Sequence, residues 1–510
     1  MGLATAGGAI FLGGTPVRAF GQSPLLAHLQ RLETDRVLVF IQLNGGNDGL
    51  NTVVPITNDL YYNRRPQIAI PATQALAIPG SVDLGLHPSF SALSPVYDDG
   101  RMAVLQNVGY PDPQLSHFDA TDIWLTASNS DDILSTGWMG RYLDVDFPDF
   151  SETPTSYPLA VQMGGTSALL FQGPAANMGM SLASPELFER IAEEGILYQT
   201  ADLPDTTFGR EMAFVRTVAN DSFLYADAVQ QASETGQNQA SYPESSLGQN
   251  LSIVARLIKG QLGARIYHVS LGGFDTHANQ GGPNGQHANL LRTLADATKA
   301  FLDDLEADGW SERVLVTTFS EFGRRVGQNG SGGTDHGTAA PMFLFGAGVE
   351  GGLYGNAPNL NDLDQTGNLR FEIDFRSVYA TVLQDWFGLA APSVQGVLGG
   401  SFDALPLISD PAMPTALEEE PVPETFTLHQ NYPNPFNPAT TLSFTLQRTE
   451  RVTLRVFDAQ GRLVQTLLDA TQPAGQHSLA FDAGHLASGS YFYTLQTTAG
   501  VKTRQMTLVR

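Results

Sequence analysis

Short apolar runs alternate with longer helical patterns along most of the chain. Five runs are continuously apolar and rich in β-branched residues, as buried strands of a parallel sheet are. They are Val37 to Leu43, Met102 to Gln106, Ile266 to Leu271, Val314 to Phe319 and Met342 to Phe345. Between them apolar residues recur every three or four positions, most clearly from His287 to Leu305. This alternation predicts an α/β domain with a mostly parallel sheet and helices on both faces.

The pattern changes near residue 405. Residues 406–424 are rich in Pro and Glu and are typical of an extended linker. In residues 425–510 the period becomes two, as in half-buried strands. The clearest alternation runs over Thr441 to Leu446, Val452 to Phe457 and Tyr491 to Thr497. We expect six or seven short strands there, forming a small all-β sandwich.

The first 30 residues have the character of an export leader. A short run of small and apolar residues ends at Val17-Arg18-Ala19, a small-x-small pattern of the kind that precedes a signal-peptidase cut. The run is too short for a stable transmembrane anchor. Because an export signal normally begins with basic residues and none precedes Arg18, we expect the true start to lie upstream. A disordered N-terminus is the alternative.

Composition narrows the possible partners and ligands. The 510 residues include 27 basic and 52 acidic side chains, a formal net charge of -25 that repels nucleic acids. This acidity is explained either by solubility or by the binding of divalent cations. The chain has no cysteine, which excludes disulfides, thiolate zinc sites and a cysteine nucleophile. Any metal must therefore be held by His, Asp or Glu.

Polar side chains gather in the loops that follow the predicted strands, where open α/β sheets place their binding sites. They are Asp48, then Ser116 and His117, then Asp275 and His277, then Glu321 and Arg324, and finally Asp335 and His336. Carboxylates with imidazoles suit Zn²⁺, Mn²⁺ or Mg²⁺, and this inventory is sufficient for the two metals of a phosphoryl or sulfuryl transfer site.

Each of these candidates also has a structural explanation. Asp48 could stabilise a turn by bonding its own backbone, and Ser116 could cap a helix. His277 and His336 could be ordinary loop histidines, and Arg324 could belong to a solvated face. The coincidence of so many candidates at one sheet edge favours a functional site.

Six segments resemble, in this order, the bacterial DUF1501 family. They are FIQLNGGNDGLNTVVP, QLSHFDATDIW, TGWMGRYL, SLGGFDTHANQ, TTFSEFGRRVGQNGSGGTDHGTAAPMF and DFRSVYATVLQDWFGL. The resemblance covers residues 36–400 and implies an alkaline-phosphatase-like domain over residues 31–405. The family is grouped with the alkaline phosphatase and sulfatase superfamily, and its members typically begin with a twin-arginine (Tat) export signal. An Arg-Arg pair is therefore expected upstream of the present start.

The same resemblance implies a set of metal ligands. Asp48 resembles the carboxylate after the first strand that binds metal in the superfamily. Asp335 and His336 resemble its Asp-His metal pair, and Asp275 and His277 resemble the ligands of the other metal.

The resemblance also implies roles in catalysis. Ser116 would be the attacking hydroxyl, activated by metal coordination. His117 and Arg324 would steady the substrate anion, and Glu321 would serve a metal.

The C-terminal part carries a separate resemblance. NYPNPFNPATTLSFTL, VTLRVFDAQGRLVQTL, AGQHSLAFDAGHLASGSYFYTLQ and VKTRQMTLVR are similar to the sorting tail of type IX secretion substrates. That tail implies passage through the periplasm, contact with the type IX secretion machinery, and delivery to the cell surface or the medium.

Together these features predict an exported, metal-dependent hydrolase of phosphate or sulfate esters, acting on a small anionic ester. Zn is the expected metal, with Mn, Mg or Ca as alternatives. The competing hypothesis is a non-catalytic surface protein that uses the same scaffold for binding or assembly. A third possibility is a metal that serves stability alone.

Overall fold

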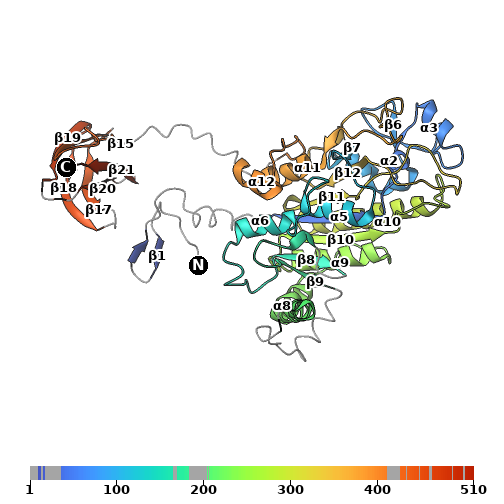
Figure 1. Cartoon of the computed structure of the whole chain (residues 1–510), viewed down its shortest axis with the longest axis horizontal. Coiled ribbons are helices and arrows are strands. Elements are labelled where there is room, and N and C mark those ends of the chain that lie inside the picture. The colour runs from blue at the N-terminus through green and yellow to red at the C-terminus, as the bar shows by residue number, and fades with distance from the viewer. Residues whose placement is uncertain are drawn as a thin grey trace. The chain divides into compact units, whose positions relative to one another are not determined.

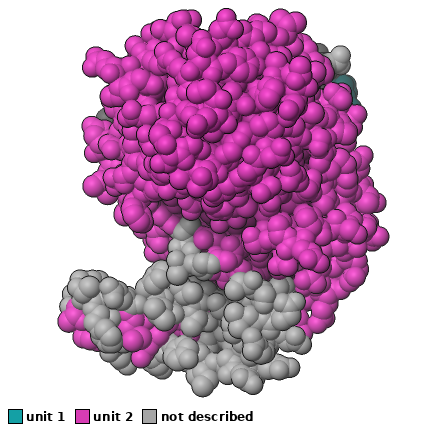
Figure 2. Space-filling view, turned by 90° about the vertical axis from the view of Figure 1, so that its right-hand side faces the viewer, with its two compact units in different colours: residues 1–21, 413–510 teal, residues 22–412 magenta. Residues whose placement is uncertain are grey.

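A computed structural model of the chain describes residues 10–12, 15–17, 36–164, 169–182, 204, 206–409, 426–431, 433–446, 448–458, 462–484, 486, 488–497 and 500–509. The chain divides into two compact units, residues 22–412 and residues 1–21 with 413–510 (Figures 1 and 2). Most of the predicted leader, including Arg18 and Ala19, and residues 410–424 of the predicted linker lie outside the described residues. The predicted domain boundaries therefore stay predictions.

The larger unit is built on one sheet, in which nine strands are described. Their order is β13-β7-β12-β11-β3-β10-β8-β9, and β14 also pairs with β7. The bounds are β3 (Val37–Asn44), β7 (Met102–Gly109), β8 (Ala160–Met163), β9 (Gly179–Leu182), β10 (Ile266–Gly272), β11 (Val314–Phe319), β12 (Ala340–Phe345), β13 (Gly352–Tyr354) and β14 (Ile373–Asp374). All five predicted strands are present, so the predicted mostly parallel α/β architecture is confirmed.

Helices cover both faces of this sheet because its central strands are apolar on both sides. Val39 and Ile41 belong to one core cluster, whereas Leu38 and Phe40, which alternate with them along β3, belong to another. The first cluster lies under η1 (Pro88–Leu93), α4 (Ser94–Asp98), α8 (Thr207–Thr235), α9 (Ser246–Lys259) and α10 (Gln286–Ala307). The second lies under α5 (His117–Thr126), α6 (Trp138–Asp146), α11 (Phe375–Thr381), η4 (Val382–Trp386) and α12 (Ala391–Leu398) (Figure 1).

Strand direction determines which loops meet at the carboxyl edge of the sheet. Strands β10 and β11 both run parallel to β3, whereas β12 is antiparallel to β11 and to β7. Consequently β7 runs in the same direction as β3, and β12 runs in the opposite direction. The loops after β3, β7, β10 and β11 therefore all leave the sheet at one edge, and β12 begins at that edge. Residues 320–339, which connect β11 to β12, lie there as well.

Smaller elements complete the larger unit. They are α2 (Gly49–Thr52), α3 (Asp59–Arg64), η2 (Leu169–Phe171), η3 (Ser311–Arg313) and a three-stranded antiparallel sheet of β4 (Val53–Pro55), β5 (Leu76–Ala77) and β6 (Leu84–Leu86). No helix among the described residues is long and apolar enough to cross a membrane.

The C-terminal part of the second unit contains two antiparallel sheets. One has the order β15-β16-β19 and the other β18-β17-β20-β21. The bounds are β15 (Phe426–Leu428), β16 (Ala439–Leu446), β17 (Glu450–Asp458), β18 (Leu463–Gln472), β19 (Gly475–Asp482), β20 (Gly489–Thr497) and β21 (Gly500–Leu508). One apolar cluster joins both sheets through residues such as Phe444 and Leu454. The predicted β-sandwich is confirmed. Strands β1 (Ile10–Leu12) and β2 (Thr15–Val17) pair as a short antiparallel hairpin.

Candidate metal centre

Glycines after β3 let three loops approach one another at the carboxyl edge. Gly45 has a φ of 120°, and a Cβ added there would lie 2.3 Å from the backbone nitrogen of Asp275. Gly46 has a φ of 83°, and its added Cβ would lie 2.5 Å from the ring of Phe322. A side chain at either position would push the loop after β3 away from the loops that follow β10 and β11.

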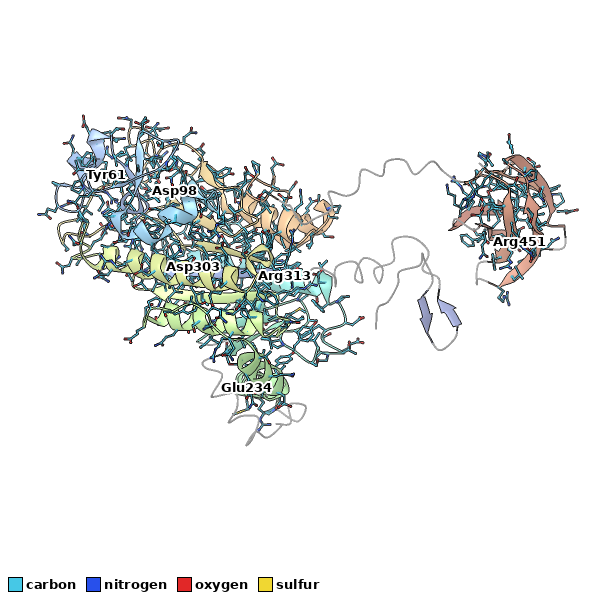
Figure 3. The ribbon with its side chains drawn as sticks, turned by 180° about the vertical axis from the view of Figure 1, so that it is seen from behind. Tyr61, Asp98, Glu234, Asp303, Arg313 and Arg451 are labelled. Atoms are coloured by element: carbon cyan, nitrogen blue, oxygen red, sulfur yellow. The ribbon has the colours of Figure 1, made fainter. Side chains whose placement is uncertain are left out.

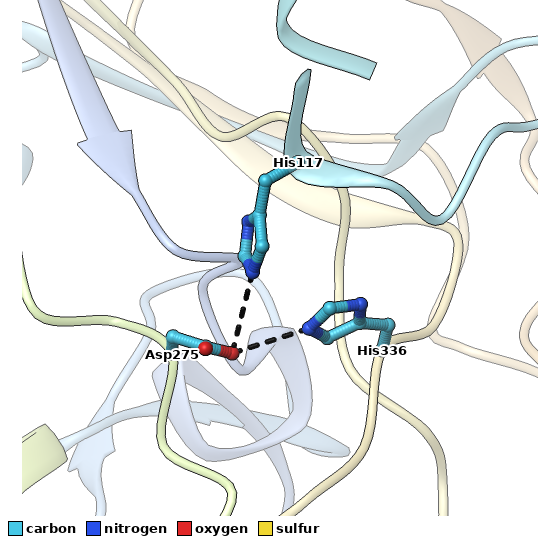
Figure 4. Close-up of side chains that lie close together, drawn as sticks. All are labelled: His117, Asp275 and His336. Carbon is cyan, nitrogen blue, oxygen red and sulfur yellow. Dashed lines mark hydrogen bonds and ion pairs between the residues drawn. The ribbon is translucent and has the colours of Figure 1, made fainter. Parts of the chain in front are cut away.

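Four of the predicted site residues converge at this edge. The Oδ1 atom of Asp275 lies 3.1 Å from Nε2 of His277, 3.2 Å from Nε2 of His336 and 3.5 Å from Nε2 of His117. The Nε2 atoms of His277 and His336 are 3.0 Å apart. Figure 4 shows His117 and His336 directing their rings at Asp275. Exposed fractions from 22% for the His336 side chain to 46% for Asp275 leave the group open to solvent.

The ring of His117 is oriented by a buried carboxylate. Its Nδ1 donates to Oε1 of Glu321 at 2.8 Å, and the same oxygen accepts from the backbone N–H of Gly45 at 2.8 Å. Glu321 is fully buried, and its backbone carbonyl accepts from the indole of Trp124 at 2.9 Å. Because the carboxylate only accepts, Nδ1 of His117 carries a proton, which leaves Nε2 as the ring nitrogen that faces Asp275.

The other two histidines are held in the same way. Nδ1 of His336 donates to the backbone carbonyl of Leu115 at 2.8 Å, and Nδ1 of His277 donates to Oδ1 of Asp335 at 3.2 Å. Asn329 donates to the same Asp335 oxygen at 3.0 Å. This hydrogen bond, together with that from His277, lowers the pKa of Asp335 below its ordinary value. The carboxylate of Asp335 therefore supports His277 from behind.

This donor set fits a divalent cation. With both Nδ1 atoms hydrogen-bonded to acceptors, the Nε2 atoms of His277 and His336 face each other across 3.0 Å, and Asp275 adds a carboxylate. Such a group is stabilised by a cation at its centre. Tetrahedral zinc holds neighbouring ligand atoms about 3.3 Å apart, given bonds of about 2.0 Å. A hydrogen bond behind each metal-binding imidazole is the usual supporting arrangement.

Arg324 ties the three loops together. The side chain is fully buried, and its Nη2 donates to Oδ1 of Asp275 at 2.6 Å. The same Nη2 also donates to the backbone carbonyls of Gly45 and Phe274, while Nε and Nη1 donate to those of Gly46 and Thr334. Partial burial raises the pKa of Asp275, but hydrogen bonds from Arg324 and His336 outweigh it and bring the pKa to about 2. This geometry favours a positioning role for Arg324 over the predicted contact with a substrate anion.

Asp48 is placed differently from the expectation. Its Oδ2 accepts from Nη1 of Arg65 at 2.6 Å and from Nε2 of Gln280 at 2.5 Å, and both members of the ion pair are fully buried. Burial raises the pKa of Asp48, but the charge of Arg65 overcomes this and lowers the pKa below its ordinary value. Arg65 in turn donates to the backbone carbonyls of Arg325 and Val326. Through Arg65 the carboxylate is therefore linked to the loop after β11, and the predicted role of Asp48 as a metal ligand stays a prediction.

The candidate metal ligands at this edge form one close group, and the prediction of two metals stays a prediction. Within the described part of the chain, one group brings three ligand atoms within 4.8 Å of one another, and it consists of His117, Asp275 and His336. His277 adjoins this group through Asp275 and His336. The histidine predicted to contact the anion, His117, is thus a candidate ligand. Glu321 and Asp335, predicted as ligands, hold histidines from behind.

Ser116 lies at the N-cap position of α5, beside His117. Its backbone carbonyl accepts from Ala120 at 2.9 Å, but its hydroxyl makes no capping hydrogen bond and the residue is exposed. Ser116 therefore caps the helix through its backbone carbonyl, and its hydroxyl takes no part in the cap. The predicted role of Ser116 as nucleophile stays a prediction.

Sequence reasoning missed Arg65 and the carbonyl of Leu115. Arg65 follows a short helix in an excursion between β3 and β7, and nothing in its local pattern distinguishes it from a surface arginine. A backbone carbonyl carries no sequence signal at all. Ser320 was also missed, although its hydroxyl accepts from Asn47 N–H at 2.9 Å and donates to the carbonyl of Leu43 at 2.7 Å.

Two parts of the chain match family models. Residues 189–398 match the model of the family described as Protein of unknown function (DUF1501). Residues 430–509 match the model described as Secretion system C-terminal sorting domain. Both resemblances expected from the motifs are confirmed. The sorting domain implies export to the cell surface or beyond.

The remaining comparisons are distant. None of the curated proteins compared with the chain matches it. The surface component PorZ of the type IX secretion system of Porphyromonas gingivalis is 21% identical over 16% of this chain and 11% of its own, with a TM-score of 0.13. The PsFucS1 sulfatase from Pseudoalteromonas sp. is 10% identical over 92% of this chain and 89% of its own, with a TM-score of 0.31. An alkaline phosphatase superfamily protein from Vibrio parahaemolyticus is 9% identical over 85% and 82%, with a TM-score of 0.32. TM-scores this low support no conclusion about activity.

Proposed function

We propose that the protein is an exported, metal-dependent hydrolase of phosphate or sulfate esters that passes through the periplasm. The observation that carries this proposal is the convergence of three imidazole Nε2 atoms on Oδ1 of Asp275, each ring held by an acceptor at Nδ1. His117, His277, His336 and Asp275 would hold the metal. Imidazole and carboxylate ligands suit Zn²⁺ best among the common divalent cations.

The chain's own residues divide the remaining tasks. A bound divalent cation would supply Lewis-acid polarisation of an ester oxygen. Glu321 and the carbonyl of Leu115 fix the tautomers of two histidines, and Arg324 fixes the carboxylate of Asp275. Ser116 lies next to His117 on the solvent side, where a small anionic ester would enter. We retain Ser116 as the proposed attacking hydroxyl for that reason.

One observation favours the non-catalytic alternative. Among the hydrogen bonds of the described residues, none joins a hydroxyl to Asp275 or to the three histidines. A protein that binds metal to shape a surface for binding or assembly would need no such hydroxyl. The two functions therefore differ in turnover and not in metal content.

A panel of 4-nitrophenyl phosphate and 4-nitrophenyl sulfate, offered to the zinc-loaded full chain, tests the proposal. We expect turnover of one ester, loss of metal and turnover in His336→Ala, and retention of both in the control His477→Ala, whose histidine lies in the C-terminal β-sandwich. Metal binding without turnover of any ester would favour the binding protein. A chelator that lowers the melting temperature of a protein with no turnover would indicate a metal for stability alone.

A further inference from the structure

One face of the large sheet becomes polar and exposed towards the carboxyl edge. Ile266 of β10 belongs to the core cluster under α5 and α6, and the alternation of side chains places His268, Ser270 and Gly272 on the same face. His268 is buried, whereas Ser270 and Gly272 are exposed. The opposite face is covered by helices such as α10, which carries Asp303 in Figure 3. The face under α5 and α6 is therefore open to solvent near the carboxyl edge.

The neighbouring strand β3 shows the same change. Gln42 lies opposite Ser270 in the parallel register. Asn44 lies opposite Gly272 and is exposed, and Gln42 is 6% exposed. Among the described residues, no hydrogen bond involves the side chain of Gln42, Asn44 or Ser270. These four residues form a polar strip, in which two amides and one hydroxyl are free to donate and to accept.

The polar strip adjoins the metal centre. Gln42 is paired with the last residue of β11, and Glu321, two residues beyond the end of that strand, holds the ring of His117. Asp275 follows Gly272 by three residues. His117 belongs to α5, so its ring reaches Asp275 from the helix layer that covers the face of the polar strip. A molecule bound at the metal centre can therefore extend over the strip.

Gly272 leaves room for such an extension. A Cβ added to this glycine would meet no atom within 4 Å, and its φ lies outside the left-handed region. Neither the backbone nor the packing therefore requires a glycine at this position. The strand rises about 7 Å from Ser270 to Gly272, and His268, which is 4% exposed, marks the buried end of the strip. This length suits one six-membered ring with its substituents.

On the basis of the proposed function, we infer that the polar strip binds the alcohol part of the ester and that this part is an uncharged, hydroxylated ring of the sugar type. Hydroxyl groups both donate and accept, as do the amides of Gln42 and Asn44 and the hydroxyl of Ser270. A charged group would find no opposite charge in the strip. An apolar group would cover three polar side chains without giving them partners, which is unfavourable.

Calorimetric titration of the zinc-loaded full chain tests the inference with probes that cannot be hydrolysed. The probes are the 6-deoxy-6-phosphonate and the 6-deoxy-6-sulfonate of glucose. Their counterparts without hydroxyl groups are cyclohexylmethylphosphonate and cyclohexylmethanesulfonate. We expect one glucose probe to bind at least about tenfold more tightly than its counterpart, which is the effect of two or more additional hydrogen bonds.

The first variant closes the space above the strip. Gly272→Val introduces a side chain that suits a strand and meets no neighbour at its Cβ, so the variant should fold and keep its zinc. It should bind the glucose probe at least about tenfold more weakly, because the hydrogen bonds to the strip are lost, and bind inorganic phosphate or sulfate as the parent does. The control is Gly396→Val in α12, where an added Cβ also meets no atom within 4 Å. Its affinities should stay within about twofold of the parent's.

The second variant removes one donor and acceptor. Ser270→Ala should lower the affinity for the glucose probe about two- to tenfold, and Ser91→Ala, at an exposed serine of η1, should not change it. Equal or tighter binding of the cyclohexyl probes, or equal binding of the glucose probe by Gly272→Val and Gly396→Val, would overturn the inference even if the parent chain hydrolyses esters. A chain that binds neither zinc nor any of these anions would overturn the inference and the proposed function together.

Discussion

Replacing Asp48 by alanine tests whether this carboxylate is structural or binds metal. Both Asp48 and Arg65 are fully buried, and the ion pair between them is 2.6 Å long. Gln280 adds a second donor to the same oxygen at 2.5 Å. Removing one partner of a buried ion pair leaves the other charge uncompensated and costs about 3–5 kcal/mol. The perturbation should therefore appear in the stability of the larger unit.

The matched control is Asp362→Ala, which breaks an exposed ion pair with Arg370. The side chains of that pair are 64% and 58% exposed, so its loss should cost at most about 1 kcal/mol. Denaturant unfolding, followed by circular dichroism, compares the two variants. Asp48→Asn keeps the shape and an acceptor oxygen, so it should fold and bind zinc as the parent chain does. The reasoning is refuted if Asp48→Ala is as stable as the control, or if folded Asp48→Asn binds no zinc.

Three further changes test the supports of the site and of the fold. Glu321→Gln removes the carboxylate that is hydrogen-bonded to His117. It should weaken zinc binding about 10- to 100-fold in a zinc titration, which is the usual effect of losing a hydrogen-bond partner behind a metal-binding histidine. An unchanged zinc affinity would contradict the proposed supporting role of Glu321. Gly45→Ala should weaken zinc binding and lower the stability, because its Cβ would lie 2.3 Å from a backbone nitrogen. The control is Gly80→Ala, which also has a positive φ but whose Cβ would have no atom within 4 Å, so it should leave zinc binding intact. Equal zinc affinities of the two variants would contradict the proposed close approach of the loops. Asp304→Asn should cost about 1.5–3 kcal/mol at neutral pH, because the carboxylate accepts from a buried lysine and two backbone N–H groups. Despite the opposing effect of burial, these bonds lower the pKa of Asp304, so the stability it adds is present above about pH 4 and is lost as pH falls through the lowered pKa. The difference in unfolding free energy between the parent chain and Asp304→Asn should therefore shrink in acid. A difference that does not change with pH would refute this prediction.

The strands and the edge at which the site lies could be predicted from the sequence. Continuous apolar runs mark buried parallel strands, and the rules of open α/β sheets place polar residues after them at one edge. That reasoning brought Asp275, His277 and His117 together correctly. His336 also lies at this edge, but the apolar runs did not reveal the reason. It precedes β12, and this strand runs antiparallel to its neighbours, so its beginning lies at the same edge as the ends of the other strands.

The roles of individual carboxylates could not be predicted. Asp48, Glu321 and Asp335 are all of a residue type that binds metals. Each of them, however, is hydrogen-bonded to a side chain from another part of the chain. Which carboxylate accepts from an arginine and which from an imidazole depends on how loops that are separated in sequence pack together. A single sequence does not encode that choice in any local spacing.

The most direct test of the metal centre is the zinc content of the purified full chain after loading and removal of free metal. Elemental analysis should find about one zinc per chain in the parent and in His477→Ala. It should find almost none in His336→Ala and Asp275→Ala, provided that circular dichroism shows both variants to be folded. A parent chain that holds no zinc, or folded His336→Ala and Asp275→Ala chains that keep the full equivalent, would contradict the account.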